Sequence, residues 1–356
     1  MTKISKFFGV ALFAVWFCLF CEPAISRADD NGPLREAQQA IDWEDYTKAA
    51  SLLNASADAG NAEALYVLGL LFLEGKGVQK NEQHAVQLFR QGAEKGDTSA
   101  RYAFGAALAS GVGIRRNYKE AVRWLHKAAE QGHAMAQHSL GSLYAYGRGV
   151  TRDENAAVDW HSRAANQGLA QAQYSLGWIY LNSKGENQSD TKAAHWFARA
   201  AEQEHVKAQN NLAYMYAEGR GYPQDVTKAV QWYARAAERG SAEAQYNLGF
   251  MYEQGRGVPQ DYNKAVEFYR KASSQNEPAA QYSLGVMYEQ GTGVPRNLSE
   301  ASRWYRLAAQ NGDQDAQAVL RAQAKTLRGS GANAPAGNRN SQKKTSASTI
   351  TRAKDE

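Results

Sequence analysis

Cysteine is nearly absent from this chain of 356 residues, since its only two cysteines, Cys18 and Cys21, both lie in the first 28 residues. If that segment is removed from the mature protein, no disulfide can form, and stability must come from packing between neighbouring segments. The N-terminal apolar run, from Phe7 to Phe20, has 14 residues. A membrane-spanning helix needs about 20 residues, so this run is too short to serve as an anchor.

The first 28 residues have the pattern of a secretory signal peptide. Two lysines precede the apolar run, and the small residues Ser26 and Ala28 follow it. We predict a signal peptide over residues 1–28, cleaved after Ala28, and therefore a periplasmic or secreted protein. A membrane anchor and a lipoprotein acceptor at Cys21 are the alternatives. Phe20 stands where a lipoprotein signal needs a small residue, which disfavours the second.

Motifs for catalysis or for a bound cofactor are also missing. The seven histidines have no metal-ligand spacing, and the chain has no H-E-x-x-H, G-x-S-x-G, phosphate-loop or dinucleotide-binding sequence. Ser189 and Lys192 form an S-x-x-K motif, but its companion motifs S-D-N and K-T-G are absent and Ser189 coincides with a predicted helix cap. The sequence therefore predicts no catalytic residue, no metal and no cofactor.

Charge is distributed unevenly along the chain. The net charge is +5, but residues 1–28 carry +2 and residues 328–356 carry +4, which leaves −1 for the rest. A nucleic-acid partner is therefore not expected. Residues 329–356 have almost no large apolar side chain, and we predict a disordered basic tail. That tail is either simply solvated or a tether to an anionic surface, and both interpretations stay open.

Most of the chain is a unit of 36 residues written seven times. Alanines at this spacing run without insertion from Ala64 to Ala316, at Ala100, Ala136, Ala172, Ala208, Ala244 and Ala280. A fixed period of this length predicts a stack of identical supersecondary units. In the unit Ala242–Glu277, apolar residues recur at helical spacing twice, on either side of Gly255 and Gly257. Each unit is therefore predicted to be a helix-turn-helix.

Glycine and hydrogen-bonding side chains mark the predicted helix ends. The Gly-x-Gly turn ends the first helix of each unit, and Asn, Asp or Ser begins the second, as Asp261 does. The position of Gly249 in the first helix is glycine in six units and alanine in the other, and we expect the next helix to approach the backbone closely there. In repeat four the turn departs from the pattern at Asn182–Ser189, and loop variation and a local kink are both possible readings.

These residues resemble the Sel-one-like repeat, a relative of the tetratricopeptide repeat. The matching pattern, A-x-A-x-x-x-L-G-x-x-Y-x-x-G-x-G-V, is complete over Ala242–Val258, and the resemblance covers about residues 45–316. It implies an all-α fold, an α/α superhelical solenoid of stacked helix-turn-helix repeats, with seven full 36-residue repeats over 62–313. Capping helices are predicted over 29–61 and 314–328. Members of the family are scaffolds with unrelated partners, in the bacterial envelope among other places.

The resemblance also suggests where a partner binds. In such a superhelix the first helices line the concave side, and we predict a protein-binding groove formed by Tyr174, Trp178, Asn210, Tyr214, Tyr246, Phe250, Glu253, Tyr282 and Glu289. Tyrosines that only wedge adjacent hairpins are the competing interpretation. The row Trp124, Trp160, Trp196, Trp232 and Trp304 is predicted to be core between repeats.

The function predicted from the sequence is a non-enzymatic scaffold or regulator of the bacterial envelope that binds a peptide or partner protein, such as an envelope sensor or assembly component. The alternative is a secreted hydrolase acting on β-lactam or cell-wall substrates, as considered for cysteine-rich relatives of the repeat. The absence of the cysteine pairs of those relatives disfavours it.

Overall fold

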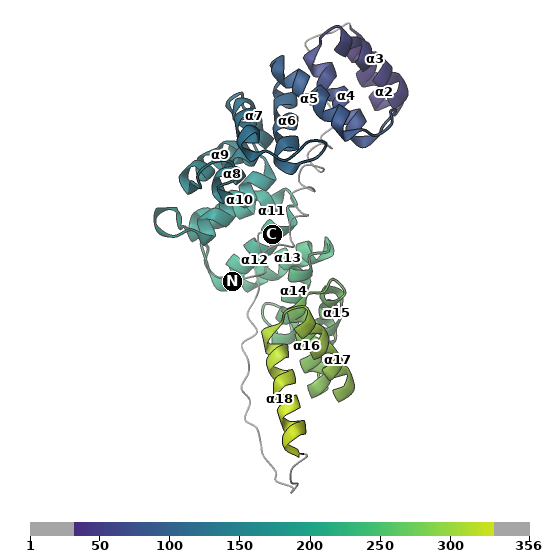
Figure 1. The fold of residues 1–356 in the computed structure, drawn as a ribbon. Coiled ribbons are helices and arrows are strands. Elements are labelled where there is room, and N and C mark those ends of the chain that lie inside the picture. The colour runs from purple at the N-terminus through teal and green to yellow at the C-terminus, as the bar shows by residue number, and fades with distance from the viewer. Residues whose placement is uncertain (1–31, 331–356) are drawn as a thin grey trace. The chain divides into compact units, whose positions relative to one another are not determined.

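The computed structural model describes residues 32–330, and this part of the chain is helical with no strand (Figure 1). The predicted signal peptide and the part of the predicted basic tail beyond Ser330 lie outside the described residues. Seven first helices alternate with seven second helices, preceded by α2 (Pro33–Asp42) and α3 (Tyr46–Asp58) and followed by α18 (Gln314–Ser330). The all-α repeat architecture predicted from the sequence is therefore confirmed.

The first helices contain the A-x-A-x-x-x-L-G pattern, and they are α4 (Ala62–Glu74), α6 (Thr98–Ser110), α8 (Ala134–Tyr146), α10 (Ala170–Asn182), α12 (Val206–Glu218), α14 (Ala242–Gln254) and α16 (Pro278–Gln290). The second helices follow the turn, and they are α5 (Glu82–Glu94), α7 (Tyr118–Glu130), α9 (Glu154–Asn166), α11 (Asp190–Glu202), α13 (Val226–Glu238), α15 (Tyr262–Ser273) and α17 (Leu298–Gln310). None of the helices in residues 32–330 is both long enough and apolar enough to cross a membrane.

Helix ends follow the predicted capping chemistry. The side chain of Asp261 accepts a hydrogen bond from the backbone N–H of Lys264. The equivalent residue caps each of the remaining six second helices in the same way. Each such cap contributes about 1 kcal/mol. Glu204, which the sequence pattern does not explain, adopts the left-handed conformation with φ of 64°, as does Asn276. Both replace the glycine that ends the second helix in other repeats.

The two helices of a repeat meet at the position of Gly249, which is glycine in six first helices and Ala213 in α12. A methyl group added at Gly249 would lie 2.8 Å from the ring of Tyr269 and 3.3 Å from the carbonyl oxygen of Ala265. The same contact recurs at Gly285, 2.6 Å from the ring of Tyr305. A larger side chain would push the helices apart, so the predicted close approach is confirmed.

The second glycine of the Gly-x-Gly turn joins one repeat to the one before it. A methyl group at Gly257 would lie 2.6 Å from the carbonyl oxygen of Val226, the first residue of α13. Its φ of 71° is also in the left-handed region. Glycine is therefore required here both for backbone conformation and for the contact between repeats.

The described chain divides into two compact units, one up to Leu176 and one from Gly177. Each unit has its own apolar core, built from the alanines and leucines of the first helices and the facing side chains of the second helices. In repeat four, α10 ends at Asn182 and a short 3-10 helix over Gly185–Asn187 replaces the Gly-x-Gly turn.

Candidate functional site

The residues predicted to form the groove differ in their exposure. Tyr174, Asn210, Tyr246 and Phe250 are buried, Trp178, Tyr214, Glu253 and Tyr282 are half-buried, and Glu289 is exposed. The four buried residues present almost no surface in this structure. The surface available to a partner along the first helices of the second unit, called here the first-helix face, consists of Trp178, Tyr214, Tyr282 and Glu289.

Packing within the repeat explains the burial of the predicted tyrosines. The ring centroids of Tyr246 and Tyr269 are 5.7 Å apart, and those of Tyr282 and Tyr305 are 5.6 Å apart. The first tyrosine of each pair is on a first helix and the second on the facing second helix. These contacts lie within a single repeat, so they differ from the competing interpretation of the sequence, in which such tyrosines wedge adjacent hairpins.

The two glutamates of the predicted groove, Glu253 and Glu289, take part in the same packing. Tyr305 donates a hydrogen bond of 2.6 Å to Glu289 Oε2, and Tyr269 donates one of 2.5 Å to Glu253 Oε2. Burial raises the pKa of Glu253, and the hydrogen bond from Tyr269 opposes that rise. Burial together with the neighbouring carboxylate raises the pKa of Tyr269 well above its usual range. Both carboxylates therefore have a structural partner within their own repeat.

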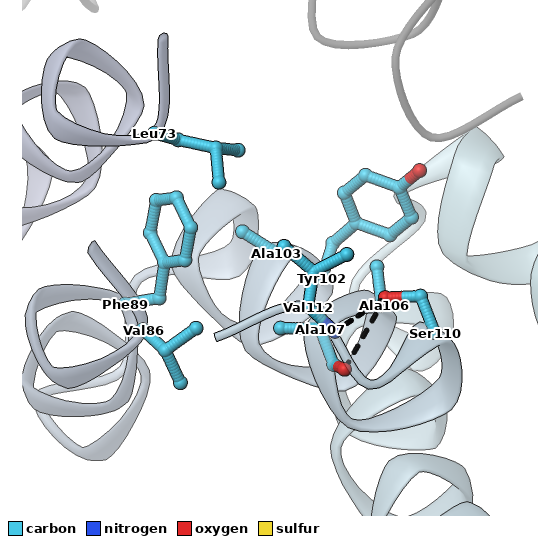
Figure 2. A pocket seen from close by; sticks show the side chains of 9 residues that line it. All are labelled: Leu73, Val86, Phe89, Tyr102, Ala103, Ala106, Ala107, Ser110 and Val112. Carbon is cyan, nitrogen blue, oxygen red and sulfur yellow. Dashed lines mark hydrogen bonds between the residues drawn. The ribbon is translucent and has the colours of Figure 1, made fainter. Parts of the chain in front are cut away.

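A small apolar pocket, called here the repeat-two pocket, lies in the first unit between repeats one and two (Figure 2). Its volume is about 20 Å³, and it is lined by Leu73, Val86, Phe89, Tyr102, Ala103, Ala106, Ala107, Ser110 and Val112. The hydroxyl of Ser110 is already used, because it donates to the carbonyl of Ala107 and accepts from the N–H of Val112. The pocket therefore suits an apolar group.

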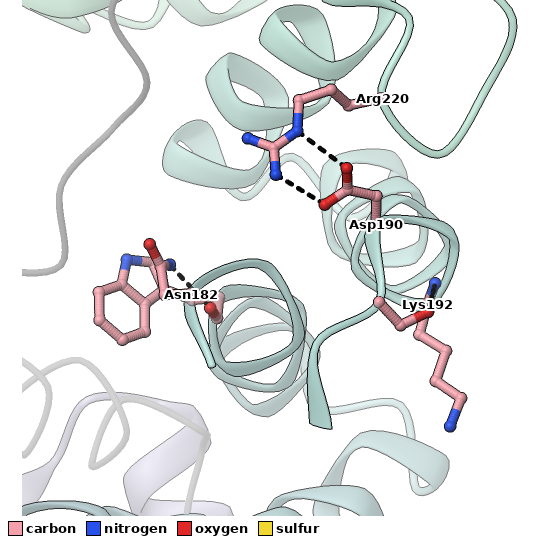
Figure 3. Close-up of polar contacts among 6 residues, drawn as sticks. Asn182, Asp190, Lys192 and Arg220 are labelled. Carbon is pink, nitrogen blue, oxygen red and sulfur yellow. Dashed lines mark hydrogen bonds and ion pairs between the residues drawn. The ribbon is translucent and has the colours of Figure 1, made fainter. Parts of the chain in front are cut away.

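The cations between the turn glycines bind neighbouring repeats. Figure 3 shows the guanidinium of Arg220 facing the carboxylate of Asp190, with two hydrogen bonds of 2.9 and 2.7 Å. Arg256 likewise reaches back to the previous repeat, where it donates to the carbonyl of Ala217 at 3.3 Å. Bidentate pairs of this kind fix geometry, so this row links one repeat to the next.

The tryptophan row lies at the edge of the core. Trp124, Trp196, Trp232 and Trp304 are half-buried, and only Trp160 is buried. The fully buried position is the next residue, which is Phe197 in repeat four and Tyr233 in repeat five. A cation three residues further on covers the ring, as Arg235 does 4.6 Å from the centroid of Trp232. The prediction that the tryptophan row forms the core is therefore wrong by one position, because the residue after each tryptophan is the one in the core.

One histidine is buried, and two half-buried histidines cap first helices. His161 is buried in α9, with its Nδ1 3.2 Å from Nδ1 of His138. His133 and His205 cap α8 and α12, where Nδ1 accepts a backbone N–H and burial lowers the pKa of each to about 4. Within residues 32–330 no group of three or more His, Cys, Asp or Glu side chains could hold a metal ion.

The S-x-x-K motif has a structural role. Ser189 Oγ accepts a hydrogen bond from the backbone N–H of Lys192 and caps α11, as the repeat pattern predicts. The ammonium of Lys192 lies 5.2 Å from the centroid of the Tyr180 ring. The two side chains therefore face structural partners, and this geometry gives no support to a serine hydrolase.

A buried glutamine row was missed by the sequence analysis. Gln245 donates to the carbonyl of Ala237 at 3.1 Å and accepts from Gln275 at 3.0 Å. The donor half of this bond recurs at Gln137, Gln173, Gln209, Gln281 and Gln317. Each glutamine ties the start of a first helix to the end of the preceding second helix. Its recurrence every 36 residues directly after the second alanine was the available signal.

Comparisons with known proteins agree with this geometry. The chain is 35% identical to c5321, a protective antigen of uropathogenic Escherichia coli with an SLR fold, with a TM-score of 0.75 over 83% of this chain and 64% of that one. It thus spans less than two thirds of that relative. A Sel1 repeat protein from Oxalobacter formigenes is 28% identical, with a TM-score of 0.63 over 86% of this chain and 99% of that one. The comparison with curated proteins gives no match.

The Sel1 repeat model matches seven consecutive segments, at residues 62–97, 98–133, 134–169, 170–205, 206–241, 242–277 and 278–313. These segments have the same period and register as the alanines from which the repeat was predicted. The chain therefore belongs to the Sel1 repeat family.

Proposed function

We propose that this protein is a non-enzymatic scaffold of the bacterial envelope that binds a peptide or partner protein on its first-helix face. Sel1 repeat proteins are generally protein-interaction scaffolds, which supports the class of function. The observation that carries the proposal is the exposure of Trp178, Tyr214 and Tyr282, one aromatic on each of α10, α12 and α16. Partly exposed aromatic side chains on a rigid scaffold are typical anchors of protein interfaces.

The site is narrower than the groove predicted from the sequence. Tyr246 and Phe250 are 3% and 7% exposed, so their contribution is to hold α14 in place. Tyr214 is the central candidate, because it lies next to Arg220, whose guanidinium is fixed on Asp190. A phenol beside a fixed guanidinium offers a partner both an apolar ring and polar contacts.

The envelope location rests on the pattern of residues 1–28 and on the relative from uropathogenic E. coli, which is described as a protective antigen. Mass spectrometry of the N-terminus of the exported protein tests it. The proposal requires a mature chain that begins after Ala28. Recovery of the full chain from the cytoplasmic fraction alone would refute the envelope role.

Site-specific photocrosslinking tests the binding surface. A photoreactive phenylalanine analogue is placed at Tyr214, at Tyr282 and at the control position Gln231, which is exposed on the second helix α13. In intact cells that produce the full chain, we expect one discrete adduct from the two tyrosine positions and none from Gln231. The absence of any adduct, or equal crosslinking from Gln231, would contradict the proposed surface.

A further inference from the structure

The repeat-two pocket results from one residue of α6 that differs from its equivalents in the other repeats. Ala107 stands at a position where each of the other six repeats has a large aliphatic side chain, namely Leu71, Leu143, Ile179, Met215, Met251 and Met287. The pocket lies between the second helix of repeat one and the first helix of repeat two, with Phe89 and Val86 from α5 on one side and Ala103 and Ala107 from α6 on the other (Figure 2). The missing side chain therefore leaves space that the neighbouring residues do not fill.

The pocket also lies on the predicted binding row. Tyr102 and Ala106 occupy in repeat two the positions that Tyr246 and Phe250 occupy in repeat six. Both are among the residues that line the pocket. Alanine at position 106 replaces a side chain that is Trp, Tyr or Phe in repeats four to six. The first unit thus has a recess where the second unit has aromatic rings.

The pocket has room for about one methyl-sized group, because a single water-sized sphere needs about 10–15 Å³ and the volume is about 20 Å³. Water is a poor occupant, since apolar cavities of this kind stay dry. The side chains that fill the same position in the other repeats are leucine, isoleucine and methionine, so the shape of the space is that of an aliphatic tip.

The charge beside the pocket is positive. Arg115 and Arg116 follow Val112 in the turn after α6, and no acidic residue is present in that turn or in the pocket lining. Arg116 donates two hydrogen bonds, of 3.2 and 2.9 Å, to the carbonyl of Ser110, which places its guanidinium at the edge of the pocket. Arg115 is exposed. A carboxylate next to the inserted apolar group would meet these cations.

We infer that the repeat-two pocket is an anchor site for a partner protein segment in which a leucine, isoleucine or methionine side chain lies beside an aspartate or glutamate. The aliphatic tip enters the space left by Ala107, and the carboxylate pairs with the arginines of the following turn. This inference rests on the proposed scaffold function and gives the chemical class of segment that the first unit recognises.

The test uses a displayed library of random peptides selected on the full-length protein. We expect enriched peptides to share an aliphatic residue next to an acidic one. Synthetic copies should bind Ala107→Met about 10-fold or more weakly, because methionine fills the pocket with the chain's own side chain. Ala109→Leu is the matched control, since Ala109 is on the same helix outside the pocket lining and the equivalent residues Leu73 and Leu181 are leucines.

The outcomes separate the pocket from the scaffold function. Thermal unfolding of Ala107→Met should occur at or above the wild-type temperature, because a cavity has been filled. Equal peptide binding by wild type and a folded Ala107→Met protein would overturn the pocket and leave the scaffold function intact. A failure to enrich any peptide on the wild-type protein would overturn both. Weaker peptide binding by the double variant Arg115→Glu/Arg116→Glu would support the pairing of the peptide carboxylate with these arginines, and unchanged binding would refute it.

Discussion

Tyr269 on α15 donates a hydrogen bond of 2.5 Å to Glu253 on α14, and the phenol ring packs on Gly249 of the same helix. Repeat seven has the same arrangement between Tyr305 and Glu289. Repeat five has the tyrosine, Tyr233, but Ala217 stands where the carboxylate belongs, and the buried hydroxyl of Tyr233 has no hydrogen-bond partner. The same ring therefore has opposite polar environments in adjacent repeats.

The phenol hydroxyl of Tyr269 should stabilise the fold, whereas that of Tyr233 should not. Tyr269→Phe leaves the carboxylate of Glu253 without its donor in a mostly buried place, and we expect it to lower the free energy of unfolding by about 1–3 kcal/mol. Tyr233→Phe removes a buried hydroxyl that has no partner, so stability should stay equal or rise. Urea unfolding of both variants makes the comparison. A loss at Tyr233 as large as that at Tyr269 would contradict the assigned environments.

Glycines at the ends of helices should differ in how much stability is lost when alanine replaces them. At Gly240, with φ of 88° and no atom within 4 Å, alanine meets backbone strain alone, which costs roughly 1–2 kcal/mol. At Gly257 the same strain is joined by a contact with the carbonyl of Val226, which adds about 1–3 kcal/mol. Thermal unfolding should therefore place Gly257→Ala well below Gly240→Ala. Equal melting temperatures would show that the contact between the repeats is not tight.

The histidine caps should make stability depend on pH. Burial, together with the charge of Lys207, lowers the pKa of His205 from 6.5 to about 4, and the neutral ring accepts the N–H of Ala208. A group whose pKa is lowered by folding contributes stability that is complete above the unfolded pKa and is lost as pH falls through the folded pKa. We therefore expect a loss between about pH 6.5 and pH 4, of at most about 3 kcal/mol for this residue.

His205→Asn separates the cap from its titration. The asparagine oxygen can accept the same N–H, as Asn61 does on α4, but it does not titrate. Its stability should match wild type near neutral pH and exceed it near pH 4.5, in urea unfolding measured at both values. A variant that loses stability as steeply as the wild type would exclude His205 as a source of the acid sensitivity. His133 caps α8 in the same way and provides an independent repeat of the experiment.

The fold could be predicted because the same residue types recur at the same place in every repeat. The alanines, the Gly-x-Gly turns and the capping residues such as Asp261 each have a local conformational role, and one sequence contains seven copies of the evidence. The glutamine row was missed although it recurs in repeats three to seven. Gln245 acts through a hydrogen bond to a carbonyl eight residues earlier, and no helix or turn rule predicts that partner.

The exposure of side chains was harder to predict than the fold. Helical spacing places Tyr246 and Phe250 on a common face, but it does not tell whether that face meets solvent or the next helix. The ring of Tyr246 packs on Tyr269, so burial is decided by a contact between two helices. The pocket at Ala107 arises because alanine replaces a large aliphatic residue in one repeat. Only the structure shows that the neighbouring side chains leave this space open.

The central claim, that the first-helix face binds a protein partner, is tested most directly by calorimetry with the partner identified through crosslinking. Tyr214→Ala should weaken binding by about 2 kcal/mol or more, which is roughly 30-fold, while Gln231→Ala on the second helix leaves the affinity unchanged. Both variants should unfold near the wild-type temperature. Equal affinity of Tyr214→Ala and wild type, with both proteins folded, would contradict the account.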